Sequence, residues 1–110
     1  MNNRDLITEF VDIAENYGRG RLNGNWGTAN EDELVARCSE EFEGLMDNAD
    51  AVKSLLKHQS DFVRYLASVN ALHNKVFLQE ASDTLVGIRD NKYDGEMKMM
   101  AYLMAIHFKL

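Results

Sequence analysis

Apolar residues recur at three- and four-residue spacing along most of the chain, a pattern that predicts amphipathic helices. The first such segment runs from Asp5 to Tyr17, with acidic residues on its other side. Gly18 follows it, at a position where glycine often ends a helix in the left-handed conformation. We therefore expect the first helix to end at Tyr17. Its predicted buried stripe consists of Leu6, Ile7, Phe10, Val11, Ile13, Ala14 and Tyr17.

A second amphipathic helix is predicted over residues 30–47. Thr28 or Asn30 can cap its start, and Thr28 with Glu31 has the spacing of a capping box. Its apolar stripe leaves Glu40 and Glu43 largely on the solvated side. The predicted stripe consists of Leu34, Val35, Cys38, Phe42, Leu45 and Met46.

Residues 50–88 contain no proline and a single glycine, Gly87. One helix of that length would reach about 60 Å, so a compact chain needs a break, which we expect at residues 70–74. The sequence leaves open whether residues 50–89 form one helix or two. A turn is predicted at 90–95, followed by a last helix that is apolar almost all round. The sequence thus predicts an all-α fold, a compact bundle of four to five helices in a single domain spanning residues 1–110.

Composition limits the chemistry that the chain can perform. Cys38 is the only cysteine, which excludes an intramolecular disulfide and a cysteine-rich zinc site. The most apolar stretch, Met97–Leu110, has 14 residues, whereas a membrane span needs about 20. The first residues also lack the basic-then-apolar order of a signal peptide. We expect a cytoplasmic protein without membrane contact.

The acidic residues are concentrated in one part of the chain. Eight of the eighteen lie between Glu31 and Asp50, against Arg37 alone, which gives this stretch a balance of −7. Such a field favours a basic partner surface and disfavours direct nucleic-acid binding. The basic residues form only a modest ridge, which consists of Lys53, Lys57 and Arg64.

The segment 18–28 is rich in glycine and is predicted to be a loop. It carries Arg19, Arg21 and Trp26, whose guanidiniums and indole could hold a phosphate, a base or an acidic peptide. A phosphate-binding loop normally follows a strand and has a lysine before its Ser/Thr, and neither feature is present here. The alternative is a mobile connector whose tryptophan packs back onto the bundle.

Two pairs of acidic residues have the spacing of metal ligands on helices. Glu40 and Glu43 share a helix face, and Glu80 and Asp83 are spaced in the same way. The two tetrapeptides, Glu40-Glu41-Phe42-Glu43 and Glu80-Ala81-Ser82-Asp83, resemble the paired motifs of the all-α MazG-type nucleoside-triphosphate pyrophosphatases. That resemblance implies Mg²⁺ held by Glu40, Glu43, Glu80 and Asp83. The alternative is a solvated helix face with an ordinary surface pair and no cofactor.

Methionines gather in the last segment, at Met97, Met99, Met100 and Met104. Methionine fills irregular gaps in cores and is also frequent on adaptable binding surfaces. Residues 97–110 therefore either complete the core or form a self-association face, through which the chain could make a homodimer.

The leading hypothesis is a non-enzymatic interaction protein, a small acidic regulator or inhibitor. Helix 30–47 would contact a basic surface, for example that of a nucleic-acid-binding protein, with carboxylates in the place of phosphates. In size and charge the chain is similar to small acidic proteins of phages and mobile elements that block restriction or CRISPR enzymes. The alternatives are the pyrophosphatase and a structural, self-assembling helical protein. The predicted partner-binding residues are Glu31, Glu33, Glu40, Glu41, Glu43 and Asp47, with Arg19, Arg21 and Trp26 beside them.

Overall fold

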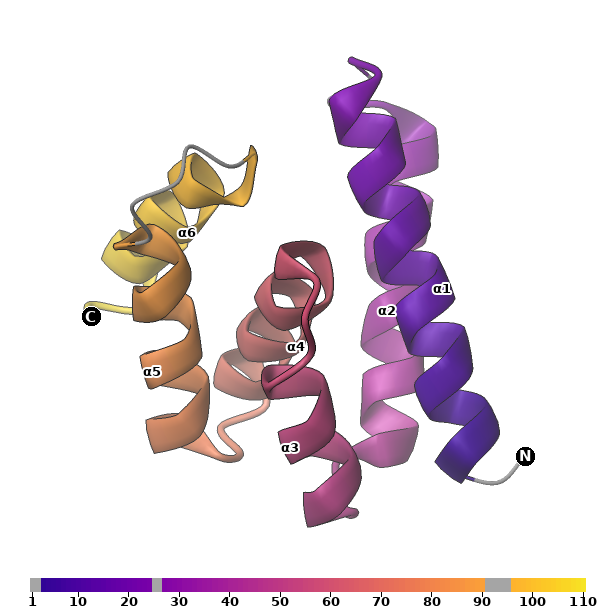
Figure 1. The fold of residues 1–110 in the computed structure, drawn as a ribbon, viewed down its shortest axis with the longest axis vertical. Coiled ribbons are helices and arrows are strands. Elements are labelled where there is room, and N and C mark those ends of the chain that lie inside the picture. Colours follow the sequence, from indigo (N-terminus) through magenta and orange to yellow (C-terminus); the bar gives the residue numbers. More distant parts are fainter. Residues whose placement is uncertain (1–2, 25–26, 91–95) are drawn as a thin grey trace.

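A computed structural model describes residues 3–24, 27–90 and 96–110. These residues form six helices and no strand, so the predicted all-α class is confirmed, with more helices than the four to five expected. Figure 1 shows them in chain order. They are α1 (Asn3–Leu22), α2 (Ala29–Leu45), α3 (Ala49–Leu56), α4 (Asp61–His73), α5 (Leu78–Arg89) and α6 (Glu96–His107).

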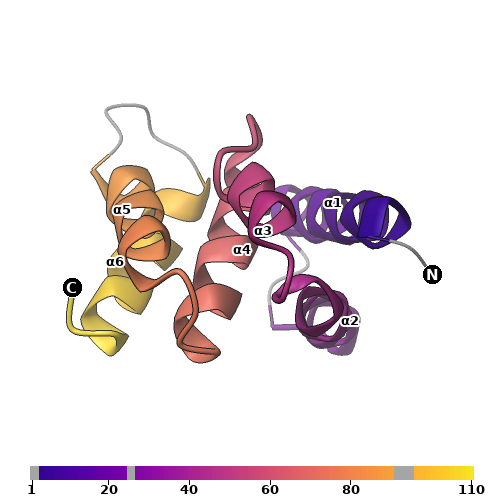
Figure 2. The same ribbon diagram turned by 90° about the horizontal axis from the view of Figure 1, so that it is seen from below.

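The helices are arranged around α4. The hairpin of α1 and α2 lies on one side of it, and α5 and α6 lie on the other (Figures 1 and 2). Helix α4 contacts all five other helices, and eight of its thirteen residues are buried. Two of these are polar, and each bonds to its own helix: the Ser68 hydroxyl donates to Tyr65 O at 2.9 Å and the Asn70 amide to Leu66 O at 2.7 Å. The core therefore leaves neither side chain without a partner.

Helix α1 continues past the end that we predicted at Tyr17. It runs to Leu22, so residues 18–22 belong to the helix and not to a loop. Gly18 lies where α1 meets α4, and a Cβ atom there would fall 2.2 Å from a ring carbon of Phe62. The glycine thus permits close helix packing and does not end the helix. The glycines that do take positive φ are Gly24 (83°) and Gly27 (66°), in the short connection that follows.

The start of α2 confirms the predicted cap. The Thr28 hydroxyl accepts a hydrogen bond from Glu31 N at 3.1 Å. The helix ends at Leu45, two residues earlier than predicted, because Asn48 caps the next helix and accepts from Ala51 N at 3.1 Å. Most of the predicted stripe is buried, namely Leu34, Cys38, Phe42 and Leu45, whereas Val35 is exposed.

The region 50–89 contains two breaks where one was predicted. The first, at residues 57–60, separates α3 from α4, and the second follows α4 at residues 74–77. At the second break, Lys75 takes a left-handed φ of 57°. Val76 N donates to Ala71 O at 3.0 Å and Lys75 N to Leu72 O at 3.2 Å, which is the Schellman arrangement that usually places glycine at this position.

The C-terminal part only partly fits the prediction. The expected turn at 90–95 falls mostly on residues 91–95, outside those described. Helix α6 buries Met97, Ala101 and Ala105 on one side only, so it is not covered all round. No helix among the described residues combines the length and apolar character needed to cross a membrane.

The left-handed lysine at the end of α4 gives a stability prediction. A non-glycine residue in this conformation costs about 1–2 kcal/mol, and part of that is offset by the greater freedom of glycine in the unfolded chain. We therefore expect Lys75→Gly to raise the free energy of unfolding by about 1 kcal/mol, measured by urea denaturation. Lys57→Gly is the control, because Lys57 ends α3 with a φ of −106°. An equal gain from both substitutions would contradict this explanation.

Candidate functional site

The outer side of α2 carries the acidic side chains that could meet a partner. Helix α2 contacts α1 and α4 through its buried apolar stripe, and the opposite side faces solvent (Figure 2). Four of the predicted binding residues are exposed there or just beyond the helix end: Glu33, Glu40, Glu43 and Asp47. None of the salt bridges found within the described residues involves these four. We call them the α2 acidic face.

Two other predicted binding residues are used inside the fold. The side chain of Arg21 is 5% exposed, and its Nη1 atom lies 3.2 Å from Glu31 Oε1. The Arg21 guanidinium also lies 5.8 Å from the centre of the Tyr17 ring. Tyr65 of α4 is buried beside this group, and burial is the main cause that raises the pKa of its hydroxyl. Arg21 and Glu31 thus join α1 to α2 within the fold, and their contact with a partner stays a prediction.

The other two loop residues that we predicted to bind a partner differ in position. Arg19 is exposed on the last turn of α1, where its guanidinium donates to the Asn16 side chain. Trp26 lies outside the described residues. The predicted ligand-binding loop is therefore mostly helix where the structure describes it.

Glu41 lies at the contact between the two antiparallel helices of the hairpin. It is half-buried. Burial raises the pKa of its carboxyl, and the Glu9 carboxyl raises it further through a hydrogen bond and like charge, while Arg37 lowers it. Glu41 therefore faces α1, unlike its neighbours Glu40 and Glu43. Its role in partner binding stays a prediction.

The predicted magnesium ligands do not come together. Glu40 and Glu43 lie on α2, whereas Glu80 and Asp83 lie on α5, with α3 and α4 between the two helices (Figure 1). Within the described residues, no three or more His, Cys, Asp or Glu side chains form a group that could hold a metal ion. Asp83 instead accepts a hydrogen bond from Gln79 Nε2 at 2.9 Å. The geometry thus does not fit the Mg²⁺ site that the resemblance implied.

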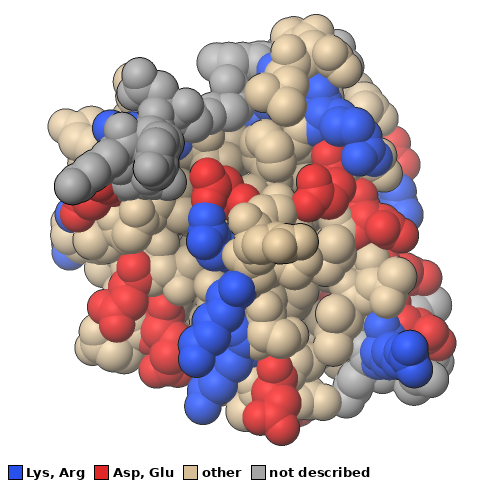
Figure 3. All heavy atoms as spheres, viewed as in Figure 1, with Lys and Arg blue, Asp and Glu red and all other residues tan. Residues whose placement is uncertain are grey.

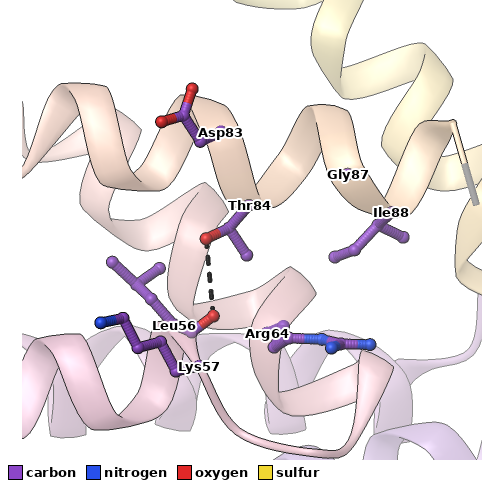
Figure 4. Close-up of a pocket in the computed structure, with 7 residues that line it drawn as sticks. All are labelled: Leu56, Lys57, Arg64, Asp83, Thr84, Gly87 and Ile88. Atoms are coloured by element: carbon purple, nitrogen blue, oxygen red, sulfur yellow. Dashed lines mark hydrogen bonds between the residues drawn. The ribbon is translucent and has the colours of Figure 1, made fainter.

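A pocket of about 310 Å³ lies between α5 and the junction of α3 and α4 (Figure 4). Lys57 and Arg64 stand on one side, and Asp83 lies on the other. A second hollow of about 410 Å³ continues past Lys53 and Glu80. Figure 3 shows a column of Lys and Arg side chains near the centre of this face, with acidic groups above, below and to its left. The sequence predicted that the basic residues of this pocket lie together, but it did not indicate that α5 packs beside them. The uncharged residues that line the first pocket are Leu56, Thr84, Gly87 and Ile88.

Neither the pocket nor the lone cysteine presents an activated nucleophile. The Thr84 hydroxyl is within hydrogen-bonding distance of two backbone oxygens, Glu80 O at 2.8 Å and Leu56 O at 3.5 Å. The pocket lining includes no histidine or cysteine. Cys38 is fully buried, and burial raises the pKa of its thiol to about 12, so the thiol stays protonated at neutral pH.

Comparison of the chain with protein-family models, curated proteins and solved structures finds no match. The α2 acidic face and the pocket must therefore be interpreted from their own chemistry.

The buried ion pair predicts a large effect of Arg21. Removing one partner of a buried pair leaves the other charge uncompensated, so Arg21→Met should lower the free energy of unfolding by about 3 kcal/mol. The exposed Arg19 is the matched control, and Arg19→Met should change stability by less than about 0.5 kcal/mol. The double variant Arg21→Met/Glu31→Leu should recover most of the loss. Equal effects of the two single substitutions, measured by urea denaturation, would show that the pair is not important.

The contact between Glu9 and Glu41 predicts a dependence of stability on pH. The folded-state pKa of Glu41 is raised above its usual 4.5. The contribution of Glu41 to the free energy of unfolding is therefore most favourable at and below pH 4.5, and it falls as the pH rises through the raised pKa. Glu41→Gln should be more stable than the wild type at pH 7, with an advantage that shrinks toward pH 4.5. The exposed Glu43→Gln is the control, and a Glu41→Gln advantage independent of pH would contradict the assignment.

Proposed function

We propose that this chain is a non-enzymatic interaction protein, a small acidic regulator or inhibitor that acts in the cytoplasm. Its α2 acidic face would bind a basic surface of a partner protein, for example a nucleic-acid-binding protein. The carboxylates would then occupy places that phosphates take in the partner's usual ligand. Direct contact with nucleic acid or a membrane is not part of this proposal.

The observation that carries the proposal is a set of exposed carboxylates on one side of α2 that form no salt bridge within the described residues. The hairpin concentrates this charge further, because residues 1–47 contain eleven acidic and four basic residues, a balance of −7 in a chain of net charge −6. Such a local field speeds the approach of a basic partner and disfavours acidic ones. Because exposed charges are screened by salt, the contact should weaken as ionic strength rises.

A second candidate function is self-association through residues 97–110. Helix α6 exposes large apolar side chains on the side that faces away from the bundle. Met99 is 65% exposed and Ile106 is 60% exposed. Exposed apolar side chains gathered on one face of a protein commonly mark an interaction site.

Charge reversal tests the leading proposal. The variant Glu40→Lys/Glu43→Lys should lose the basic proteins that the immobilised wild type retains from a lysate of its own cells. The control is Glu80→Lys/Asp83→Lys on α5, which makes the same change at the same spacing away from α2. Retention should also fall at least tenfold between about 0.05 M and about 0.5 M salt, because the Debye length shortens.

The identity of each retained protein is read by mass spectrometry, and its affinity is then measured with the purified partner. A partner that binds the Glu40→Lys/Glu43→Lys variant as tightly as the wild type would exclude the α2 acidic face as its binding surface. A partner lost only in the α5 control would move the binding surface to the pocket.

A further inference from the structure

Helix α6 has two apolar sides. Its inner side packs on α5 and α4 and buries Met97, Ala101 and Ala105. The opposite side carries four large apolar residues that are each about half exposed or more. No other described helix covers them. These four residues, which we call the α6 seam, are Met99, Tyr102, Leu103 and Ile106.

The spacing of the α6 seam suits pairing with another helix. Met99, Leu103 and Ile106 are separated by four and then three residues, which is the alternation of core positions in a two-helix coiled coil. Tyr102 lies on the same face, three residues after Met99 and four before Ile106. All four positions project from a helix of only twelve residues, so the seam is short. A partner helix that presents the same spacing would fit it.

The exposed area is sufficient for a small interface between two copies. The four side chains leave on the order of 400 Å² accessible, within the range of the largest apolar patch on a typical monomer. Burying this patch on two copies, with its polar rim, approaches the roughly 1,000 Å² that a specific interface needs. A weak dimer is therefore the expected product.

The charges around the seam permit this approach. The rim is polar, because Arg89 bonds to Asp90 at 2.9 and 3.1 Å and Lys98 is close enough to lower the pKa of Asp90. Residues 97–110 contain Lys98 and Lys109 and no acidic residue. The acidic hairpin of α1 and α2 lies on the far side of α4 (Figures 1 and 2). Two copies that meet at α6 thus keep their acidic hairpins apart.

We propose that the α6 seams of two copies pair antiparallel about a two-fold axis near Tyr102 and Leu103. Met99 then packs against Ile106 of the second copy. Lys98 lies near the carbonyl end of the partner helix, where the helix dipole favours a positive charge. A parallel pair would instead place the two Lys98 side chains together. This inference rests on the second candidate function and specifies its geometry.

The antiparallel pair would also make the particle bivalent. The two α2 acidic faces would lie at opposite ends of the dimer, because α2 and α6 lie on opposite sides of α4 in each copy. A partner with two basic sites, or an assembly that repeats one site, would then bind by two contacts. Linked contacts raise the overall affinity without any new type of contact.

Sedimentation velocity over a concentration series tests the association. The wild type should change from monomer to dimer as its concentration rises. Leu103→Glu/Ile106→Glu should remain monomeric over the same range, with a dissociation constant of the dimer at least tenfold larger than that of the wild type. The matched control is Leu22→Glu on α1, because Leu22 is 65% exposed and lies away from α6. This control should dimerise like the wild type, and circular dichroism should show that all three proteins are folded.

Disulfide trapping then tests the antiparallel register. Met99→Cys and Ile106→Cys proteins, mixed and mildly oxidised, should form a covalent heterodimer, and each alone should stay largely uncrosslinked. Residues 99 and 106 are about 10 Å apart along the helix, so the two registers are distinguishable. The buried Cys38 should not interfere.

The outcomes separate the inference from the function on which it rests. A wild type that is monomeric at every concentration would overturn both self-association and the antiparallel pair. A dimer in which each cysteine variant cross-links with itself would keep self-association and overturn the antiparallel register. Oligomers that grow beyond the dimer would overturn the two-fold pairing.

Discussion

The burial of α4 is the constraint on which the rest of the structure depends. Because α4 contacts every other helix, its surface must suit several neighbours at once. Small residues, Ala67 and Ala71, are fully buried in it, and Gly18 of α1 lets the Phe62 ring approach the facing backbone. A helix enclosed in this way separates the hairpin of α1 and α2 from the pair of α5 and α6. The two outer pairs are then free to carry different surfaces.

Local signals in the sequence predicted the helices but only some of their ends. The Thr28 cap was predictable because the capping residue, the acidic first turn and the apolar stripe all place the start of α2 within the same few residues. Gly18 misled the prediction, because the reason for that glycine is its contact with Phe62 of another helix. The break after α4 was placed a few residues early, because Lys75 takes a left-handed conformation that usually calls for glycine. Both errors come from tertiary contacts or from an unusual residue at a cap.

The exposed charges of the candidate site were predictable from the sequence. The contacts that depend on how α1 and α2 align against each other were not. Glu40 and Glu43 are exposed, as the apolar spacing of α2 predicted. Arg21 and Glu31 are ten residues apart and meet only because the hairpin folds antiparallel. The same register brings Glu9 to Glu41. The pocket escaped prediction for a similar reason, since nothing in the sequence indicates that α5 packs beside the basic side chains of α3 and α4.

Two features of this fold do not serve the stability of a single copy. Like charges at Glu9 and Glu41 repel one another across the hairpin. The α6 seam exposes large apolar side chains at positions where polar side chains would interact better with water. Glu9 and Glu41 meet between α1 and α2, whereas the α6 seam lies on the exposed side of an outer helix, where α4 imposes no packing requirement. A departure from local consistency such as the α6 seam is expected where a surface meets something outside the monomer. The acidic surface on one side of α4 and the apolar one on the other are the basis of the two separate contacts that we propose, one made by charge and one by burial.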